Sequence, residues 1–369
     1  MGKKIRRKNG HRLVDLHTTH GVYQVNNQRY IKEDGSHSSF LEEINPVNTG
    51  RYSAALDSLI CKWVNEISYE KLRELLVLVT GNAQLSRNGL EEYIIQRAVQ
   101  ISRDQCLESL HFPYDSVLIE EDIDVYSADK EEIILMMDDV SVKAQKPHKK
   151  VERAEEDVKR IGITIGLMST KSGGYDTFTE GIDAKGVVVY PIEDVILDKL
   201  AEHHCQDEAL PIIAITDGAK SIRLSLQKIV GLNLCIILDW YHLSHKVANL
   251  MSMIACNKED KAIYIKDLTL FLWNGKVQES IDCLNAMNKI KNKDVHLELR
   301  GYLQKHQAEI IDYERRQNAG KTIGSGRVEK ANDIIVAKRQ KKKGMAWSTV
   351  GAKALAIVNL FQLNNKQAA

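Results

Sequence analysis

The chain has 369 residues, of which 43% are hydrophobic and 27% are charged, and its 51 Lys and Arg residues against 50 Asp and Glu residues leave a formal net charge of +1. This composition excludes a disordered chain and a uniformly basic protein, so a polyanion would have to be held by local basic patches. At roughly 150 residues per domain, the length predicts two or three domains.

The sequence offers no signal for a membrane or a secreted location. Its apolar runs are far shorter than the roughly 20 residues that span a bilayer, and no apolar stretch follows the basic N-terminus. The cysteines are scattered without a CxxC pair, which argues against a disulfide scaffold or a Cys-rich zinc site. We therefore expect a protein of the reducing cytoplasm with no membrane partner.

The first part of the chain is predicted to be a polar segment followed by helices. Residues 1–50 carry a basic run and are interpreted as a solvated segment, with a loop over 35–50. Residues 51–115 have helical spacing, and a break near Gly81 precedes a helix that starts with Arg87 and Asn88. This pattern indicates a DNA-binding helix-turn-helix, and an ordinary three-helix bundle explains it equally well.

Residues 130–256 alternate predicted strands and helices, which indicates an α/β fold with a mixed sheet flanked by helices. The predicted strands cover 132–143, 161–168, 186–190, 211–216 and 232–238. The predicted helices cover 194–203, 220–230 and 241–254. Residues 257–320 contain no convincing strand and predict an all-helical insertion, after which residues 321–369 supply two more helices.

Acidic residues follow the apolar runs of three predicted strands. They are Asp138 with Asp139, then Asp217, then Asp239. Because open α/β sheets present ligand-binding groups at the carboxyl ends of strands, we expect these acids to share a site. Neighbouring strand residues point to opposite faces, so only one of Asp138 and Asp139 fits it, and the pattern does not choose between them. Asp217 and Asp239 each precede a helix, and helix capping is the alternative interpretation.

A further acid, Glu329, lies in the first turn of a predicted helix that follows Gly324, Ser325 and Gly326. The helix dipole favours a carboxylate at this place, and a back-reaching cap of the same helix is the alternative. Clustered carboxylates repel one another, and a divalent cation such as Mg²⁺ removes that cost. The acids together therefore predict a metal site.

The motifs occur in a specific order: Asp138, ITDGA at 215–219, LDWYHL at 238–243, GSGRVE at 324–329 and KGMAWS at 343–348. From about residue 50 to 363 the chain resembles bacterial insertion-sequence transposases with a DDE core of the RNase H-like (retroviral-integrase-like) fold, specifically the Kra-type group and its Lre-type relatives. Asp239 to His242 also resembles the D-x-x-H signature of Mutator-like transposases. Two departures are Asp139, where Gly is usual, and the lack of paired cysteines in residues 1–50.

The resemblance implies a metal-dependent DNA transposase with an N-terminal DNA-binding region. Its catalytic and metal-binding triad would be Asp138, Asp217 and Glu329, which would hold two Mg²⁺ or Mn²⁺ ions, with Asp239 and His242 in supporting roles. The core would span 130–256 and 321–369. The partners would be the DNA of the element ends and of the target, and a second copy of the chain, in the bacterial nucleoid.

Basic residues near the predicted helix-turn-helix and the predicted acids, together with one asparagine, are the candidates for DNA contacts. They are Arg87, Asn88, Lys220, Arg327, Lys338, Arg339, Lys341, Lys342 and Lys343. Two other hypotheses stay open, namely a catalytically inactive or domesticated transposase-derived DNA-binding protein, and a structure-selective nuclease on the same fold.

Overall fold

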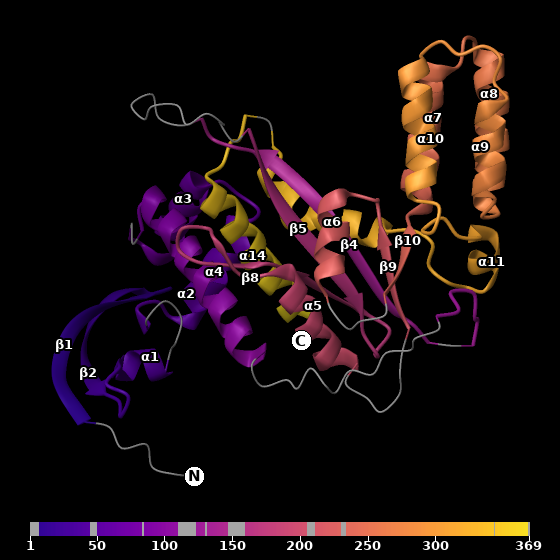
Figure 1. Ribbon diagram of the computed structural model, residues 1–369. Helices are drawn as coiled ribbons and strands as arrows, with labels where there is room; N and C mark the ends of the chain where they lie inside the picture. Colours follow the sequence, from indigo (N-terminus) through magenta and orange to yellow (C-terminus); the bar gives the residue numbers. More distant parts are fainter. Residues whose placement is uncertain are drawn as a thin grey trace.

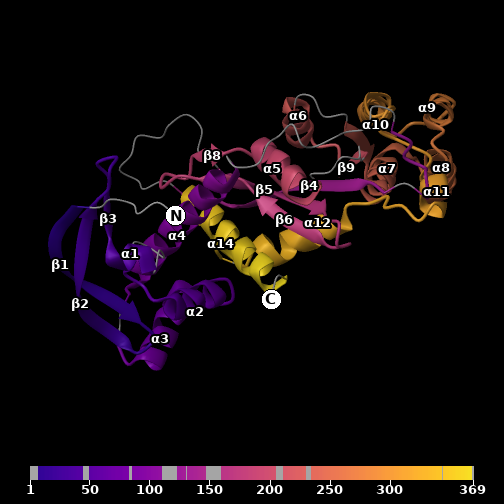
Figure 2. The same ribbon diagram turned by 90° about the horizontal axis from the view of Figure 1, so that it is seen from below.

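The computed structural model describes residues 7–44, 50–82, 85–109, 123–129, 131–146, 159–204, 211–229, 234–342 and 344–367. Figure 1 shows an N-terminal β-ribbon with neighbouring helices, a central sheet, and a group of long helices beyond the sheet. Seen from below, the ribbon and the helices α8 (Lys258–Trp273) and α9 (Val277–Asn285) lie at opposite ends of the molecule (Figure 2).

The N-terminal part of the chain is a β-sheet, which the sequence analysis did not predict. Strands β1 (Arg7–Thr18) and β2 (Gly21–Ile31) form a long antiparallel hairpin, β3 (His37–Ser39) pairs with β2, and α1 (Phe40–Ile44) follows. The predicted loop over 35–50 is therefore wrong where the structure describes it, because β3 and α1 lie there. Most side chains of β1 are exposed or half-buried, so the strand lacks the apolar alternation that marks a buried face.

The three helices predicted after this sheet are confirmed. They are α2 (Ala54–Val64), α3 (Tyr69–Thr80) and α4 (Arg87–Ser109). Ser53 and Ser68 cap the first two by accepting hydrogen bonds from backbone N–H groups two or three residues into each helix. Figure 2 shows α4 beside the last helix, α14 (Thr349–Gln367). Buried Leu90 and Ile94 make α4 a core helix along much of its length.

The central sheet is mixed, as predicted, and has five strands in the order β10-β9-β4-β5-β6. Strands β4 (Ile133–Lys143), β5 (Arg160–Ser169) and β6 (Tyr175–Thr179) form an antiparallel meander. Strands β9 (Ile212–Thr216) and β10 (Leu234–Leu238) run parallel to β4. The predicted strand near 186–190 is β8 (Val188–Tyr190), which instead pairs with β7 (Gly181–Ile182) in a separate ribbon.

The two faces of the sheet are covered by different helices. Ile133, Leu135 and Met137 of β4 pack in one apolar cluster with α5 (Ile192–His204) and α6 (Lys220–Lys228). Ile134 and Met136 belong to a larger cluster on the other face, together with residues of α4, α7 (Trp240–Ile254) and α14. Strand alternation thus sends odd and even residues of β4 to different cores.

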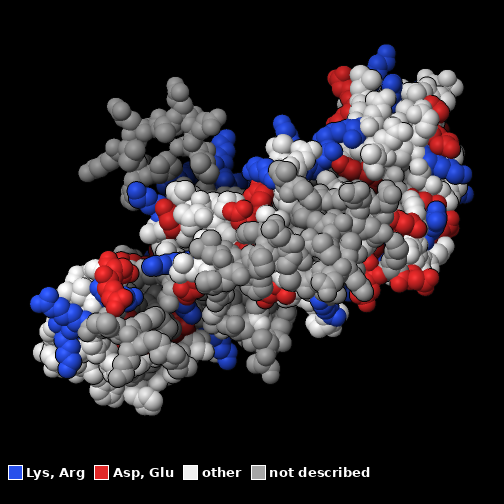
Figure 3. Space-filling model, turned by 60° about the horizontal axis from the view of Figure 1, so that its bottom comes forward, with Lys and Arg blue, Asp and Glu red and all other residues white. Residues whose placement is uncertain are grey.

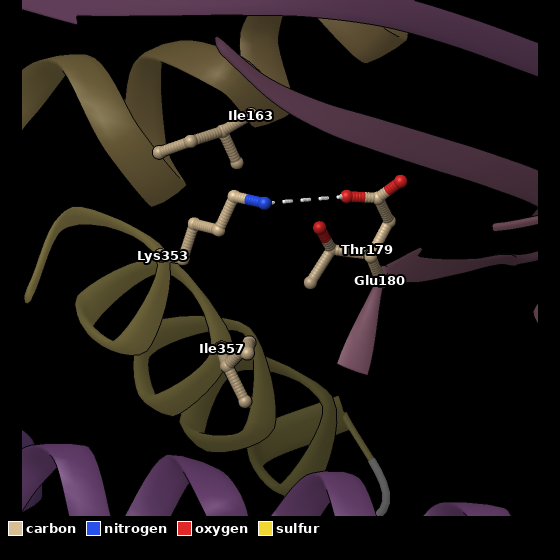
Figure 4. A pocket seen from close by; sticks show the side chains of 5 residues that line it. All are labelled: Ile163, Thr179, Glu180, Lys353 and Ile357. Carbon is tan, nitrogen blue, oxygen red and sulfur yellow. Dashed lines mark ion pairs between the residues drawn. The ribbon is translucent and has the colours of Figure 1, made fainter. Parts of the chain in front are cut away.

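An ion pair connects α14 to the segment that follows β6 at the edge of the sheet. Figure 4 shows Lys353 of α14 pointing toward Glu180, which follows β6, with its Nζ 3.9 Å from a carboxylate oxygen. Ile163 of β5 and Ile357 line the same small pocket. Burial raises the pKa of Glu180, and the charge of Lys353 opposes that shift.

Helices follow β10 almost without interruption, as the sequence predicts for residues 257–320. After α7, α8 and α9 come α10 (Lys293–Lys305) and α11 (Tyr313–Asn318). Asn257 and Asn292 cap α8 and α10 by accepting backbone N–H hydrogen bonds. The chain then forms α12 (Gly326–Asn332), a π-helical turn (Asp333–Ala337) and α13 (Lys338–Gln340). Among the described residues, none of the helices has the length and apolar character to cross a bilayer.

Candidate active site

Strand register brings three of the predicted acids to one row of the sheet. Met136 of β4 lies opposite Ile215 of β9, and Thr216 lies opposite Leu238 of β10. Continued to the strand ends, these registers place Asp138, Asp217 and Asp239 side by side. The backbone N–H of Asp239 donates to the Thr216 carbonyl at 2.8 Å, which extends the pairing to this row. Alternation directs the three carboxylates to the side of the larger apolar cluster.

The geometry separates Asp138 from Asp139. Burial, and then the charge of Asp217, raise the pKa of Asp138, so these two carboxylates are close enough to repel. Asp139 points to the opposite face, where its oxygens accept hydrogen bonds from the hydroxyls of Thr164 at 2.6 Å and Ser221 at 2.7 Å. Of the two neighbours, only Asp138 points to the face of the sheet on which Asp217 lies. The sequence had left open which of the two does so.

Asp239 is a buried helix cap, so the alternative interpretation made for it is confirmed. Its Oδ1 accepts from the backbone N–H of His242 at 2.8 Å, and its Oδ2 accepts from the backbone N–H of Ser325. Burial alone would raise the pKa of Asp239, but these hydrogen bonds and the His242 ring, whose Nδ1 lies 3.4 Å away, outweigh it and lower the pKa. Asp239 thereby ties the start of α7 to the loop that precedes α12.

Gly324 is required where that loop passes α7. A Cβ at this position would lie 2.7 Å from the Tyr241 ring and 3.3 Å from Oδ2 of Asp239. The glycine therefore allows the backbone to approach the buried carboxylate closely.

Asp217 uses one oxygen to order its own turn. Its Oδ1 accepts from the backbone N–H of Ala219, the N-cap residue of α6, at 2.8 Å. The next residue, Gly218, has a φ of +82°, and a Cβ there would lie 2.9 Å from the ring of His306. The alternative of Asp217 as the cap of this helix is wrong, because Ala219 is the N-cap residue and no side chain caps the helix; the Asp217 side chain is half-buried.

His306 belongs to a buried polar group that the sequence analysis missed. Its Nδ1 is 2.5 Å from Oε2 of Glu309, and the other oxygen of Glu309 pairs with Arg223 of α6 at 2.6 Å. Because these residues come from α6 and from the chain after α10, and no local motif joins them, only the fold brings them beside Gly218.

Glu329 lies at the rim of the row of acids, in the first turn of α12, with a side chain that is 50% exposed. Its Oε1 is 3.6 Å from Nδ1 of His242. One turn later in the same helix, Asn332 donates from Nδ2 to Oδ2 of Asp138 at 2.6 Å. The Ser325 N–H donates to Asp239, and Ser325 is itself the N-cap residue, so the alternative of a back-reaching Glu329 cap is wrong.

His242 is the positive group among these acids. The Asp239 carboxylate beside the ring raises the pKa of His242 to about 9, with help from the charges of Glu329 and Asp217 and against the effect of burial. Its Nδ1 is 3.4 Å from Asp239 and 3.6 Å from Glu329. At neutral pH an imidazolium therefore compensates part of the negative charge.

The donor set of the predicted triad suits a hard divalent cation. Asp138, Asp217 and Glu329 offer carboxylate oxygens, and the amide oxygen of Asn332 is buried without a hydrogen-bond partner among the described residues. The ligand atoms of the triad are not all within 4.8 Å of one another, in contrast to those of another group, Asp176, Glu202 and His203. The carboxylate oxygens of the triad are therefore farther apart than the ligands of one bound metal ion would be.

The second group, Asp176 with Glu202 and His203, could hold a metal ion by geometry alone. In the structure its charges are already balanced, because Nζ of Lys199 lies 2.7 Å from both Asp176 and Glu202. Hydrogen bonds from His203 and Lys199 outweigh burial and lower the pKa of Asp176. We interpret this group as an ion-pair cluster between α5 and β6.

Most of the basic residues predicted to contact DNA are exposed. This holds for Arg87, Asn88, Lys220, Arg327, Lys338, Lys341 and Lys342. Arg327 lies over the ring of Tyr175 at 4.7 Å, and Lys338 pairs with Glu66 at 2.7 Å. Lys343 lies outside the described residues.

Arg339 is a correction to that set. It is only 2% exposed, donates to the Val64 carbonyl at 3.0 Å, and lies over the Trp347 ring at 4.9 Å. Its guanidinium therefore joins α13 to α2 and to the segment before α14, and is not presented to a phosphate.

No protein-family model matches the sequence, and no curated protein matches it either. Among solved structures, the chain is similar to the Drosophila P element transposase strand transfer complex, with 10% sequence identity and a TM-score of 0.25 over 89% of this chain and 83% of that chain. A TM-score this low defines neither the fold family nor the function, so both are inferred from the residues themselves.

Proposed function

We propose that this protein is a DDE transposase that cleaves DNA at the ends of an insertion sequence and transfers the cut strand to a target. The observation that carries the proposal is the meeting of Asp138 and Asp217 at one row of the sheet with the helix of Glu329, whose Asn332 donates to Asp138 at 2.6 Å. In the sequence, Asp138 and Asp217 are 79 positions apart (217 − 138), and Asp217 and Glu329 are 112 positions apart (329 − 217). The proposed acidic site would therefore join distant parts of the chain.

The sheet topology supports an RNase H-like fold for the catalytic core. An antiparallel meander is followed by two strands that run parallel to its first strand and lie on its other side, which gives the order β10-β9-β4-β5-β6. Residues 257–320 are helical and stand between β10 and the helix of Glu329. This is the arrangement that the proposed all-helical insertion requires.

The chain's own residues would position the acids and control their charge. Asp138, Asp217 and Glu329 would hold two Mg²⁺ or Mn²⁺ ions, which when bound stabilise the attacking and leaving oxygens of a phosphoryl displacement. Asp239 fixes the entry to α12, and His242 balances charge at the rim. A water molecule would hydrolyse a phosphodiester, and the freed 3′-hydroxyl would attack a target phosphate, with no covalent protein intermediate.

The remaining parts of the proposal concern DNA and assembly. Exposed Arg87 and Asn88 at the head of α4 are proposed to contact bases, and Lys220, Arg327, Lys338, Lys341, Lys342 and Lys343 to contact phosphates. We further propose that the protein acts as a homo-oligomer on DNA, in a bacterial nucleoid.

The experiment is a nicking and strand-transfer assay with the full chain, Mg²⁺ and a plasmid that carries the DNA flanking the gene. We expect Asp217→Asn to reduce nicking to background while DNA binding persists. Asp139→Asn is the matched control, because Asp139 lies on the opposite face and hydrogen-bonds Thr164 and Ser221. Equal loss in both variants would contradict the proposed triad.

A second candidate function is a transposase-derived DNA-binding protein without catalysis. The pairing of Glu329 with His242, and the spread of the triad beyond 4.8 Å, favour it. DNA binding without nicking by the unaltered chain would support this alternative. Nicking without joined strand-transfer products would instead indicate a structure-selective nuclease.

A further inference from the structure

The N-terminal ribbon carries an open hollow of about 300 Å³. Its lining residues lie between positions 12 and 51, far in sequence from Asp138, Asp217 and Asp239. Its lining includes Arg12 of β1, Arg29 of β2 and Arg51, which follows Gly50. We call this hollow the arginine pocket. Figure 3 shows some Lys and Arg side chains at the end of the molecule where the ribbon lies, next to a patch of Asp and Glu side chains.

Strand register places two of the arginines on one face. Arg12 lies opposite Asn27, and Arg29 lies two residues along from Asn27 and opposite Ser39. Residues directly opposite, and those two apart along a strand, project to the same face of a sheet. Polar side chains from three strands therefore surround the same hollow.

The third arginine is brought to the pocket by a specific backbone contact. Gly50 has a φ of +76°, and a Cβ there would lie 2.6 Å from the carbonyl carbon of Leu41. The next residue, Arg51, accepts a backbone hydrogen bond from the N–H of His17 in β1 at 2.8 Å. The chain after α1 thus returns to the ribbon, where Arg51 joins the lining.

The charge of the pocket is left largely uncompensated by the protein. None of the three guanidinium groups forms an ion pair with a carboxylate of the residues that the structure describes. Glu42 is the one acid among the described lining residues, and its Oε2 accepts from the backbone N–H of Ser39 at 2.9 Å. With Glu42 counted, the lining keeps a net positive charge, which favours an anion as the ligand.

We propose that the arginine pocket binds a phosphate group. Guanidinium groups match phosphate oxygens in two-point hydrogen bonds, and the side chains of Asn27 and Ser39 lie beside them as further polar partners. The phosphate comes either from a DNA backbone or from a free phosphate or nucleotide. The pocket does not depend on the acidic site, so it stands even where the chain has no nicking activity.

The test compares Arg29→Gln and Arg12→Gln with Arg103→Gln, an exposed arginine of α4 outside the pocket, all in the full chain. Duplex DNA binding is measured across a range of salt concentrations. For a DNA phosphate, we expect each pocket variant to bind more weakly and to lower the slope of log affinity against log salt by about 1. Arg29→Lys keeps the charge and should restore part of the affinity.

A second arm uses inorganic phosphate and pyrophosphate as probes and follows the thermal midpoint at constant ionic strength. A free-phosphate ligand would raise the midpoint of the unaltered chain and of Arg103→Gln but not of Arg29→Gln, with DNA binding unchanged. Wild-type behaviour of both pocket variants in both arms would overturn the proposal. Circular dichroism of each variant checks that the ribbon is folded, and loss of nicking alone has no bearing on the outcome.

Discussion

Single side chains of α12 connect two parts of the acidic site. Glu329 faces His242, and Asn332, one turn later, donates to Asp138. Asn332 is 6% exposed, so its position is fixed by packing as well as by this hydrogen bond. Under the proposed function Asn332 would act through the carboxylate of Asp138 that it holds in place, so we regard Asn332 as a positioning residue.

We expect Asn332→Ala to raise the Mg²⁺ concentration needed for half-maximal nicking by roughly 10–100-fold, the usual cost of losing a partner of a metal ligand. The reason is that Asp138 loses the hydrogen bond that orients its carboxylate. Nicking rates measured over a Mg²⁺ titration give the result. Asp333→Asn, at the exposed next position, is the control, and an unchanged Mg²⁺ dependence in Asn332→Ala would remove this role.

His204 provides a prediction about pH, at the end of α5. Burial lowers the pKa of His204 below its ordinary value of 6.5, while its Nε2 donates to the Ser169 carbonyl at 2.7 Å. The folded state therefore favours the neutral ring. Its contribution to stability is present above pH 6.5 and is lost as the pH falls from 6.5 toward the lowered pKa.

Urea unfolding measured between about pH 5 and about pH 8 checks this sign. The change in the free energy of unfolding per pH unit should be more positive in the unaltered chain than in His204→Gln, whose amide can still donate to Ser169, because the raised pKa of His242 acts in the opposite direction in both proteins. His11→Gln on the exposed ribbon should leave the slope as in the unaltered chain. A slope for His204→Gln that equals or exceeds the original would show that burial does not favour the neutral ring.

At the scale of elements, the sequence predicts the strands that are buried in the core and misses the strands that are exposed. The strand that carries Asp138 and the strand that precedes Asp217 both contain a continuous apolar run before the acid, because both faces of the sheet are covered by helices. Strand β1 has mostly exposed or half-buried residues, so no apolar pattern marks it. For Arg339 the prediction of an exposed side chain is wrong. A run of Lys and Arg indicates a solvated face, but this member of the run is buried.

The site shows the same limit. Strand-end acids could be predicted to converge, because parallel pairing aligns the ends of neighbouring strands. The choice of Asp138 over Asp139 could not, since both faces of β4 are equally apolar in sequence. His306 and Glu309 could not be found either, because they meet Gly218 only through the return of the chain from the helical region.

Close packing between strands β5 and β6 gives a prediction about the sheet. A Cβ on Gly166 would overlap the ring of Phe178 opposite it on β6, with the ring Cδ2 at 2.9 Å. Phe178 is 1% exposed and has little room to move. We expect Gly166→Ala to lower the free energy of unfolding by about 1–3 kcal/mol, the cost of overpacking a core.

Gly162→Ala is the matched control in the same strand. Nothing lies within 4 Å of a Cβ built there, so chemical denaturation should show no loss of stability. Because glycine weakens a strand interior, a small gain is the expected direction. Equal destabilisation of both variants would mean that glycine serves β5 through its backbone and not through the space it leaves for Phe178.

At the scale of the whole molecule, one apolar core runs from the N-terminal helices to the helical region. The same cluster contains Leu56 of α2, Ile215 of β9, Leu268 of α8 and Leu299 of α10. Continuous packing of this kind favours a single cooperative unfolding transition. The helical region is therefore part of the core that supports the acids, and its removal would expose the apolar side of α7.

An aromatic cluster next to Asp239 makes this coupling testable. Trp240 begins α7 and meets Trp273 of α8, with ring centroids 4.7 Å apart, while Tyr313 lies 5.1 Å from Trp240 and donates from its hydroxyl to the Leu238 carbonyl. We expect Trp273→Ala to destabilise the whole chain by an amount at the lower end of the roughly 3–5 kcal/mol seen for buried tryptophans, since Trp273 is only partly buried.

Hydrogen exchange resolved along the chain is the measurement, with Leu270→Ala, a 57% exposed position of the same helix, as control. In Trp273→Ala, protection should fall together in α8 and in β9, because the two share one core. Protection lost in α8 to α10 alone, with β9 unchanged, would mean that the helical region opens independently. The row of acids would then be held by the sheet and α12 without its support, and variants of α8 should leave nicking intact.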